Sequence, residues 1–187
     1  MAWACAKCLF LDLPLRDAIS AQSISTLPQF GCQELWNIAW AIATMSLSHH
    51  PLIDSIASAA RPKMTQFATW GISSTAWAFA RMLCLDLPLF DAISSASLPK
   101  ISESGPQELV NTAWAFATIS LRNLPLLDAI SSASLARYSD FGSQNIANTA
   151  WAFAKLVIVD EPLMDALAAA SIPRLREFKP PESTCIA

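Results

Sequence analysis

The chain has 187 residues, of which 53% are hydrophobic, 14% are charged and only four are glycine. So little glycine, beside so much alanine, serine and leucine, argues against a β-rich fold and favours packed helices. The net charge of −3 excludes a strongly basic nucleic-acid-binding domain, so any contact with nucleic acid must come from local charge.

Three residue types recur every 37 residues over five copies, which identifies an internal repeat. Three types holding one register cannot reasonably be chance. The recurring residues are Trp3, Trp40, Trp77, Trp114 and Trp151, with Pro14, Pro51, Pro88, Pro125 and Pro162, and Asp17, Asp54, Asp91, Asp128 and Asp165.

The repeat divides residues 1–178 into two-helix units. Neither helix of a unit can bury its apolar side alone, whereas stacked units share a continuous core. We therefore predict an all-α fold, an α-solenoid of tandem two-helix repeats, as a segment of a longer array. Its parts are a partial unit at 1–11, four full units at about 12–48, 49–85, 86–122 and 123–159, a partial unit at 160–178 and a disordered tail at 179–187.

The first helix of each unit begins at a Pro-Leu pair, because proline suits the first turn of a helix. An apolar stripe at helical spacing follows, as in Leu89, Ile93 and Ala96. Candidate N-caps lie two residues before the proline, at Asp12, Asp86, Asn123 and Asp160. A second proline ends the helix early in three copies, at Pro62, Pro99 and Pro173.

The second helix follows a turn around Gly31, Gly105 and Gly142 and spans roughly 15 residues, about 22 Å. In one copy Leu35, Ala39, Ile42 and Met45 share a face that we expect to meet the core. In the next copy Gly71 and Ser73 replace a glutamate and a large residue, so its first turns should be the weakest part of the array.

The alternation of a PLxDAI helix with a PQELxNTAWAFA helix resembles the octotricopeptide repeat proteins, relatives of the FAST-kinase-like, RAP-domain proteins of organelles. The resemblance covers the chain from Met1 to about Phe178, and its most specific block is PQELVNTAWAFA at 106–117. It implies an α-solenoid that binds organellar RNA, in chloroplast or mitochondrion, and supports RNA processing, stability or translation.

A polar stripe on the second helix is the first candidate binding surface. Asn37, Ala41 and Thr44 lie on one face, and stacked units would align their equivalents into a ladder along a ribose-phosphate backbone. The position of Thr44 is cationic or threonine in every copy. The candidates are Asn37, Thr44, Ser74, Arg81, Asn111, Thr118, Asn148 and Lys155.

Two parts of this helix also have structural interpretations, which we favour. A recurring asparagine is more often bonded to the backbone of a neighbouring loop than to a ligand. The tryptophans have alanine neighbours, so packing in the core is favoured over a stacking platform for bases.

A second column of cations lies late in the first helix, at Lys63, Lys100, Arg137 and Arg174. A row of cations at unit spacing could bind phosphates. Cations near a helix C-terminus also interact favourably with the helix dipole, and both interpretations stay open.

Other sites receive little support from the sequence. Cys5 and Cys8 form a CxxC, but they occupy core positions of the repeat, so we predict no metal. The odd number of cysteines, five, suggests free thiols in a reducing compartment.

The 19 residues from Leu35 to Ile53 lack charge but cross a predicted turn, so no membrane insertion is expected. We find no catalytic motif and expect neither an enzyme nor a cofactor.

The leading hypothesis is therefore an organellar protein that binds single-stranded RNA along the array, each unit facing roughly one base. The alternative is a scaffold that binds protein or peptide partners. Low charge and net acidity favour the scaffold, whereas the family resemblance and the cationic columns favour RNA.

Overall fold

A computed structural model describes residues 24–46 and 50–177 of the chain, and the regular elements in these residues are all helices. The all-α prediction is confirmed for this part of the chain. The predicted partial unit at 1–11 and tail at 179–187 lie outside the described residues, as do Asp12, Cys5 and Cys8.

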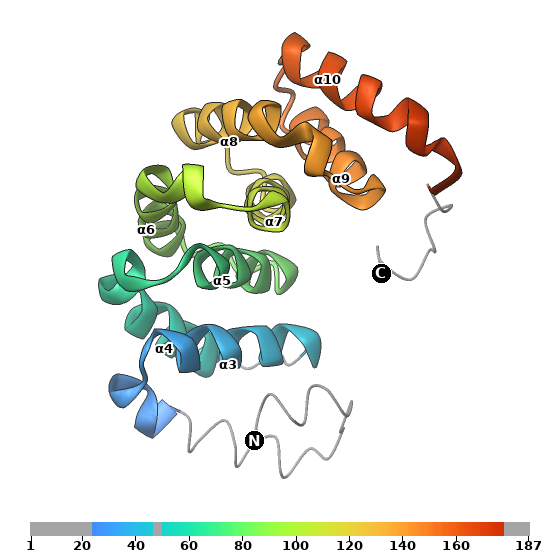
Figure 1. The fold of residues 1–187 in the computed structure, drawn as a ribbon. Coiled ribbons are helices and arrows are strands. Elements are labelled where there is room, and N and C mark those ends of the chain that lie inside the picture. Colours follow the sequence, from blue (N-terminus) through green and yellow to red (C-terminus); the bar gives the residue numbers. More distant parts are fainter. Residues whose placement is uncertain (1–23, 47–49, 178–187) are drawn as a thin grey trace.

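The helices form two layers that stack into a curved body (Figure 1). The inner layer, on the concave side, consists of α3 (Cys32–Thr44), α5 (Thr69–Arg81), α7 (Pro106–Thr118) and α9 (Ser143–Lys155). The outer layer consists of α4 (His50–Ala60), α6 (Leu87–Ser97), α8 (Leu124–Arg137) and α10 (Glu161–Ser171). Within each layer, the first residues of successive helices are 37 positions apart.

The outer helices begin as the sequence predicts. Proline lies in the first turn of α6, α8 and α10. In each of these helices the backbone N–H of the third residue donates to the side chain of the N-cap residue. The capping side chains are those of Asp86, Asn123 and Asp160. The carboxylate of Asp86, for example, accepts from Leu89 N at 2.8 Å. A cap of this kind stabilises a helix by about 1 kcal/mol.

The predicted early end of the outer helices is also confirmed. After α4, α6 and α10 the chain tightens into 3₁₀ turns that hold the second proline, namely η2 (Arg61–Gln66), η3 (Leu98–Glu103) and η5 (Ile172–Glu177). Ala136 stands where the other units have that proline, and α8 accordingly continues to Arg137 before the short η4 (Tyr138–Asp140). Another short turn, η1 (Leu27–Gln29), precedes α3.

The core lies between the layers and continues from unit to unit. Leu35, Ala39 and Ile42 are buried as predicted, whereas Met45 is only partly buried. The largest fully buried side chains are phenylalanines, and Phe79, Phe116 and Phe153 share one repeat position. The others are Phe67, Phe90 and Phe141. Phe90 and Phe116 meet edge to face, with ring centroids 5.3 Å apart. The packing of this core determines which side of each inner helix remains exposed to solvent.

The helix α5 accommodates Gly71 for a packing reason. A Cβ atom at this position would lie 3.1 Å from the indole of Trp36 and 3.1 Å from the ring of Phe67. Glycine therefore lets Trp36 of α3 lie close against α5. The helix α5 is regular from Thr69 onward. The predicted weakness of its first turns concerns stability, so it remains a prediction.

Candidate nucleic-acid interface

Each inner helix presents one side away from the outer layer, and a column of tryptophans runs along it. This tryptophan column consists of Trp40, Trp77, Trp114 and Trp151. The first three are partly buried, and Trp151 is 42% exposed. The predicted packing of these rings in the core is therefore only partial, because each tryptophan keeps some exposed surface.

The alanines of the predicted ladder are not part of that surface. Ala41, Ala78, Ala115 and Ala152 are completely buried. Their lack of bulk allows neighbouring inner helices to pack closely, because each alanine leaves room for the facing helix. The alanine position of the predicted polar stripe is therefore covered by protein and is not available to a ligand.

Two cations of the candidate stripe lie over tryptophan rings. The Arg81 guanidinium carbon is 5.5 Å from the ring centroid of Trp77, and Lys155 Nζ is 5.0 Å from that of Trp151. Both cations are exposed. Arg81 Nε also donates to the carbonyl of Ala43 in the preceding inner helix at 3.3 Å. A cation over an indole face stabilises the pair by about 0.5–1 kcal/mol at exposed sites and holds the charge beside the ring.

The two threonines at the same repeat position differ in their bonding. Thr44 Oγ1 donates to the carbonyl of Trp40, one turn earlier, at 2.8 Å. Thr118 Oγ1 is buried and has no hydrogen-bond partner within the described structure. A buried hydroxyl without a partner is uncommon in proteins.

The asparagine column lies partly buried on the inner layer. Asn37, Asn111 and Asn148 are half-exposed, and Ser74 at the equivalent place is buried. Asn111 Oδ1 accepts from Gln107 Nε2 of its own helix at 2.7 Å. This bond joins two side chains of one exposed helix face, so the predicted tie to a loop backbone does not describe Asn111.

The second cationic column joins successive units. Lys63, Lys100, Arg137 and Arg174, which we call the clamp column, each donate to two backbone carbonyls of the preceding unit, 33 and 35 residues earlier. Lys100 Nζ, for example, is 2.5 Å from Phe67 O and 2.8 Å from Thr65 O. These carbonyls end the 3₁₀ turns. The bonds account for the clamp column without phosphate, so we leave it out of the proposed interface.

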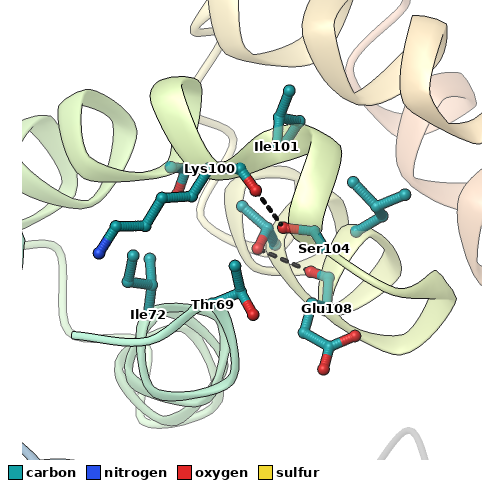
Figure 2. Close-up of a pocket in the computed structure, with 9 residues that line it drawn as sticks. Thr69, Ile72, Lys100, Ile101, Ser104 and Glu108 are labelled. Carbon is teal, nitrogen blue, oxygen red and sulfur yellow. Dashed lines mark hydrogen bonds between the residues drawn. The ribbon is translucent and has the colours of Figure 1, made fainter.

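A small cavity lies between α5, η3 and α7 beside the clamp (Figure 2). Its volume of about 10 Å³ is the space of a single water molecule, far below the several hundred cubic ångströms of a small-molecule site. Figure 2 shows the Ser104 hydroxyl directed to the carbonyl of Lys100, and the ammonium of Lys100 directed away from the cavity. This cavity is therefore too small to hold a small-molecule ligand.

Trp36 and Trp70 form an aromatic pair outside the tryptophan column, which the sequence interpretation did not single out. Trp70 is 47% exposed and lies on α5 where the other inner helices have Gln33, Gln107 and Gln144. Its ring meets that of Trp36 edge to face, with centroids 5.9 Å apart and planes at 88°. The sequence signal for this pair was the tryptophan that replaces glutamine at this repeat position in one copy.

The two described cysteines, Cys32 and Cys84, are free thiols. Burial, followed by the carboxylates of Asp54 and Asp86, raises the pKa of the Cys84 thiol above its ordinary value. A raised pKa disfavours the reactive thiolate at neutral pH. Among the described residues, no helix is long and apolar enough to cross a membrane.

These observations define the class of protein: in its described residues it is an all-helical, two-layered protein whose inner helices carry a tryptophan column with cations over two of the rings. The chain belongs to the family of the RNA-editing substrate-binding complex 6 protein, whose model matches residues 1–183. The family is RNA-associated by its description. A comparison with curated proteins finds no match.

Proposed function

We propose that this protein binds single-stranded RNA on its inner layer, as an α-solenoid with a 37-residue repeat and without enzymatic activity of its own. The observation that carries the proposal is the tryptophan column with Arg81 and Lys155 held over its rings. Indoles stack on any unpaired base, and adjacent cations bind the phosphates between bases. The family's description as part of an RNA-editing substrate-binding complex supports RNA as the ligand.

The finer parts of the proposal rest on the resemblance to octotricopeptide proteins. They are an organellar location, in mitochondrion or chloroplast, and a role in RNA processing, stability or translation. Because the family is named for a complex, we also propose that the protein has protein partners. The candidate residues kept for RNA are the inner ones: Asn37, Thr44, Arg81, Asn111, Thr118, Asn148 and Lys155. Ser74 is buried, so we leave it out of the proposed interface.

The test is binding of the chain to a fluorescent single-stranded RNA across a salt series, measured by anisotropy. The variant Arg81→Met, Lys155→Met removes both cations but keeps unbranched side chains over the rings. For single strands, each lost phosphate contact lowers the slope of log affinity against log salt by about 0.7, so we expect a change of about 1.4. Arg122→Met is the matched control, because Arg122 is an exposed cation in the loop between α7 and α8.

Equal slopes for the double variant and Arg122→Met would overturn the role of Arg81 and Lys155. Absence of RNA binding at low salt by a folded, monomeric sample would overturn the RNA proposal as a whole. The scaffold for protein partners would then be the better description of this array.

A further inference from the structure

Trp114 of α7 and Trp151 of α9 face each other across the boundary between two units. Their ring centroids are 6.3 Å apart and the planes are inclined by only 27°. Trp151 is 42% exposed and Trp114 is partly exposed, so both rings keep surface that a ligand can reach.

A base between two indoles requires their planes to be parallel and about 6.8 Å apart, because stacked bases lie about 3.4 Å apart. The centroids of Trp114 and Trp151 are 6.3 Å apart and their planes are inclined by 27°. Entry of a base therefore requires rotations that align and separate the two rings, which partly exposed side chains can make.

We propose that the indoles of Trp114 and Trp151 form a slot that takes one unpaired nucleobase between them. The proposal rests on the proposed binding of single-stranded RNA and specifies its site. The slot recognises the π-face of a base, so it accepts any base and excludes one that is paired in a duplex.

Polar groups suited to the rest of a nucleotide lie around the slot. Lys155 Nζ, 5.0 Å from the ring centroid of Trp151, is exposed and supplies a cation for an adjoining phosphate. Thr118 follows Trp114 by one helical turn, and its buried hydroxyl has no partner in the described structure. A base that opens the slot gives this hydroxyl access to a polar group of the nucleotide.

The other tryptophan pair on the inner layer has the wrong geometry for a slot. The planes of Trp36 and Trp70 are at 88°, so the edge of one ring closes the face of the other. Trp70 is as exposed as Trp151, at 47% against 42%. Replacement of Trp70 therefore removes an equally accessible indole without affecting the slot.

The experiment compares Trp151→Leu with Trp70→Leu in binding to an RNA of about 12 nucleotides and to the same sugar-phosphate strand without bases. We expect Trp151→Leu to weaken RNA binding by about tenfold, which corresponds to about 1.4 kcal/mol and is typical of one stacked base. We expect Trp70→Leu to change it less than twofold. Both variants should bind the strand without bases as the unaltered chain does.

Two results, obtained with variants whose circular dichroism matches that of the unaltered chain, would overturn the slot. Trp151→Leu would weaken RNA binding no more than Trp70→Leu, or it would weaken binding of the strand without bases equally. In each case RNA binding by the unaltered chain would still stand, and the proposed function with it. Failure of the unaltered chain to bind RNA would overturn both.

Discussion

The residue that follows the C-cap of each inner helix has a backbone conformation that is unfavourable for residues other than glycine. Ser46, Leu83, Ser120 and Val157 have φ between 51° and 57°, the left-handed region. The N–H of Cys84 bonds to Phe79 O and that of Leu83 to Ala80 O, which is the bonding of a Schellman motif. Glycine is the usual residue at this place, and a branched side chain costs roughly 1–2 kcal/mol there.

Leu83→Gly should therefore stabilise the protein. Leu83 is 74% exposed, so its replacement sacrifices little apolar burial. We expect the free energy of unfolding, measured in urea, to rise by about 0.5–1 kcal/mol, because relief of strain exceeds the entropic cost of glycine.

Leu85→Gly is the control for this prediction. Leu85 is 54% exposed, two residues away, and its φ is not in the left-handed region. Glycine there should leave stability unchanged or lower it. An equal gain from both variants would contradict the explanation by strain.

At the scale of the element, the clamp column determines how one outer segment joins the preceding unit. Its members donate to carbonyls at the ends of 3₁₀ turns, where the helix geometry leaves those oxygens without partners. Lysine serves in two units and arginine in two others, with the same acceptors relative to the repeat. The requirement is thus for a long cationic donor.

Lys100→Met should lower stability without weakening RNA binding. It removes the bonds to Thr65 O and Phe67 O while keeping an unbranched stem. Bonds to a charged group contribute about 1.5–3 kcal/mol, and we expect a loss of this size in urea unfolding.

Lys100→Arg is the matched control, because Arg137 and Arg174 make the same bonds in their units. It should retain nearly all the stability. Reduced RNA affinity in Lys100→Met, with no change in unfolding, would instead return the clamp column to the RNA interface.

At the scale of the whole molecule, each inner helix packs on its immediate neighbours. The helix α7 contacts α5 and α9, and α5 also contacts α3. The free energy of unfolding of such a stack is approximately the sum of the stabilities of its units and of the interfaces between them. Destabilisation of one unit should therefore affect the adjacent units first.

Phe116→Ala tests this spread. Phe116 is fully buried in α7, so its truncation should cost about 3–5 kcal/mol. Hydrogen exchange should accelerate most in α7 and in its neighbours α5 and α9, and least in α3.

Phe116→Leu keeps most of the volume and should cost clearly less than the alanine variant. Equal acceleration of exchange in every helix, including α3, would show that the array unfolds as one unit and would contradict the prediction.

The sequence by itself determined the helical class, the helix starts and their caps. These depend on local chemistry: Asp86 and Asn123 cap the turn that follows them, and Ala136 in place of proline lengthens α8. The repeat also placed equivalent residues in register, so the inner cations Arg81 and Lys155 could be selected before the structure was known.

Only the tertiary structure decided what the columns do. Whether Lys100 meets phosphate or protein depends on carbonyls 33 and 35 residues earlier, which no local pattern reveals. Likewise, one side of a tryptophan is buried or accessible according to the angle between successive units. That angle also sets the separation of 6.3 Å between Trp114 and Trp151 and the perpendicular contact of Trp36 with Trp70. It results from packing of the whole core, because close-packed side chains jointly fix how one helix lies on the next.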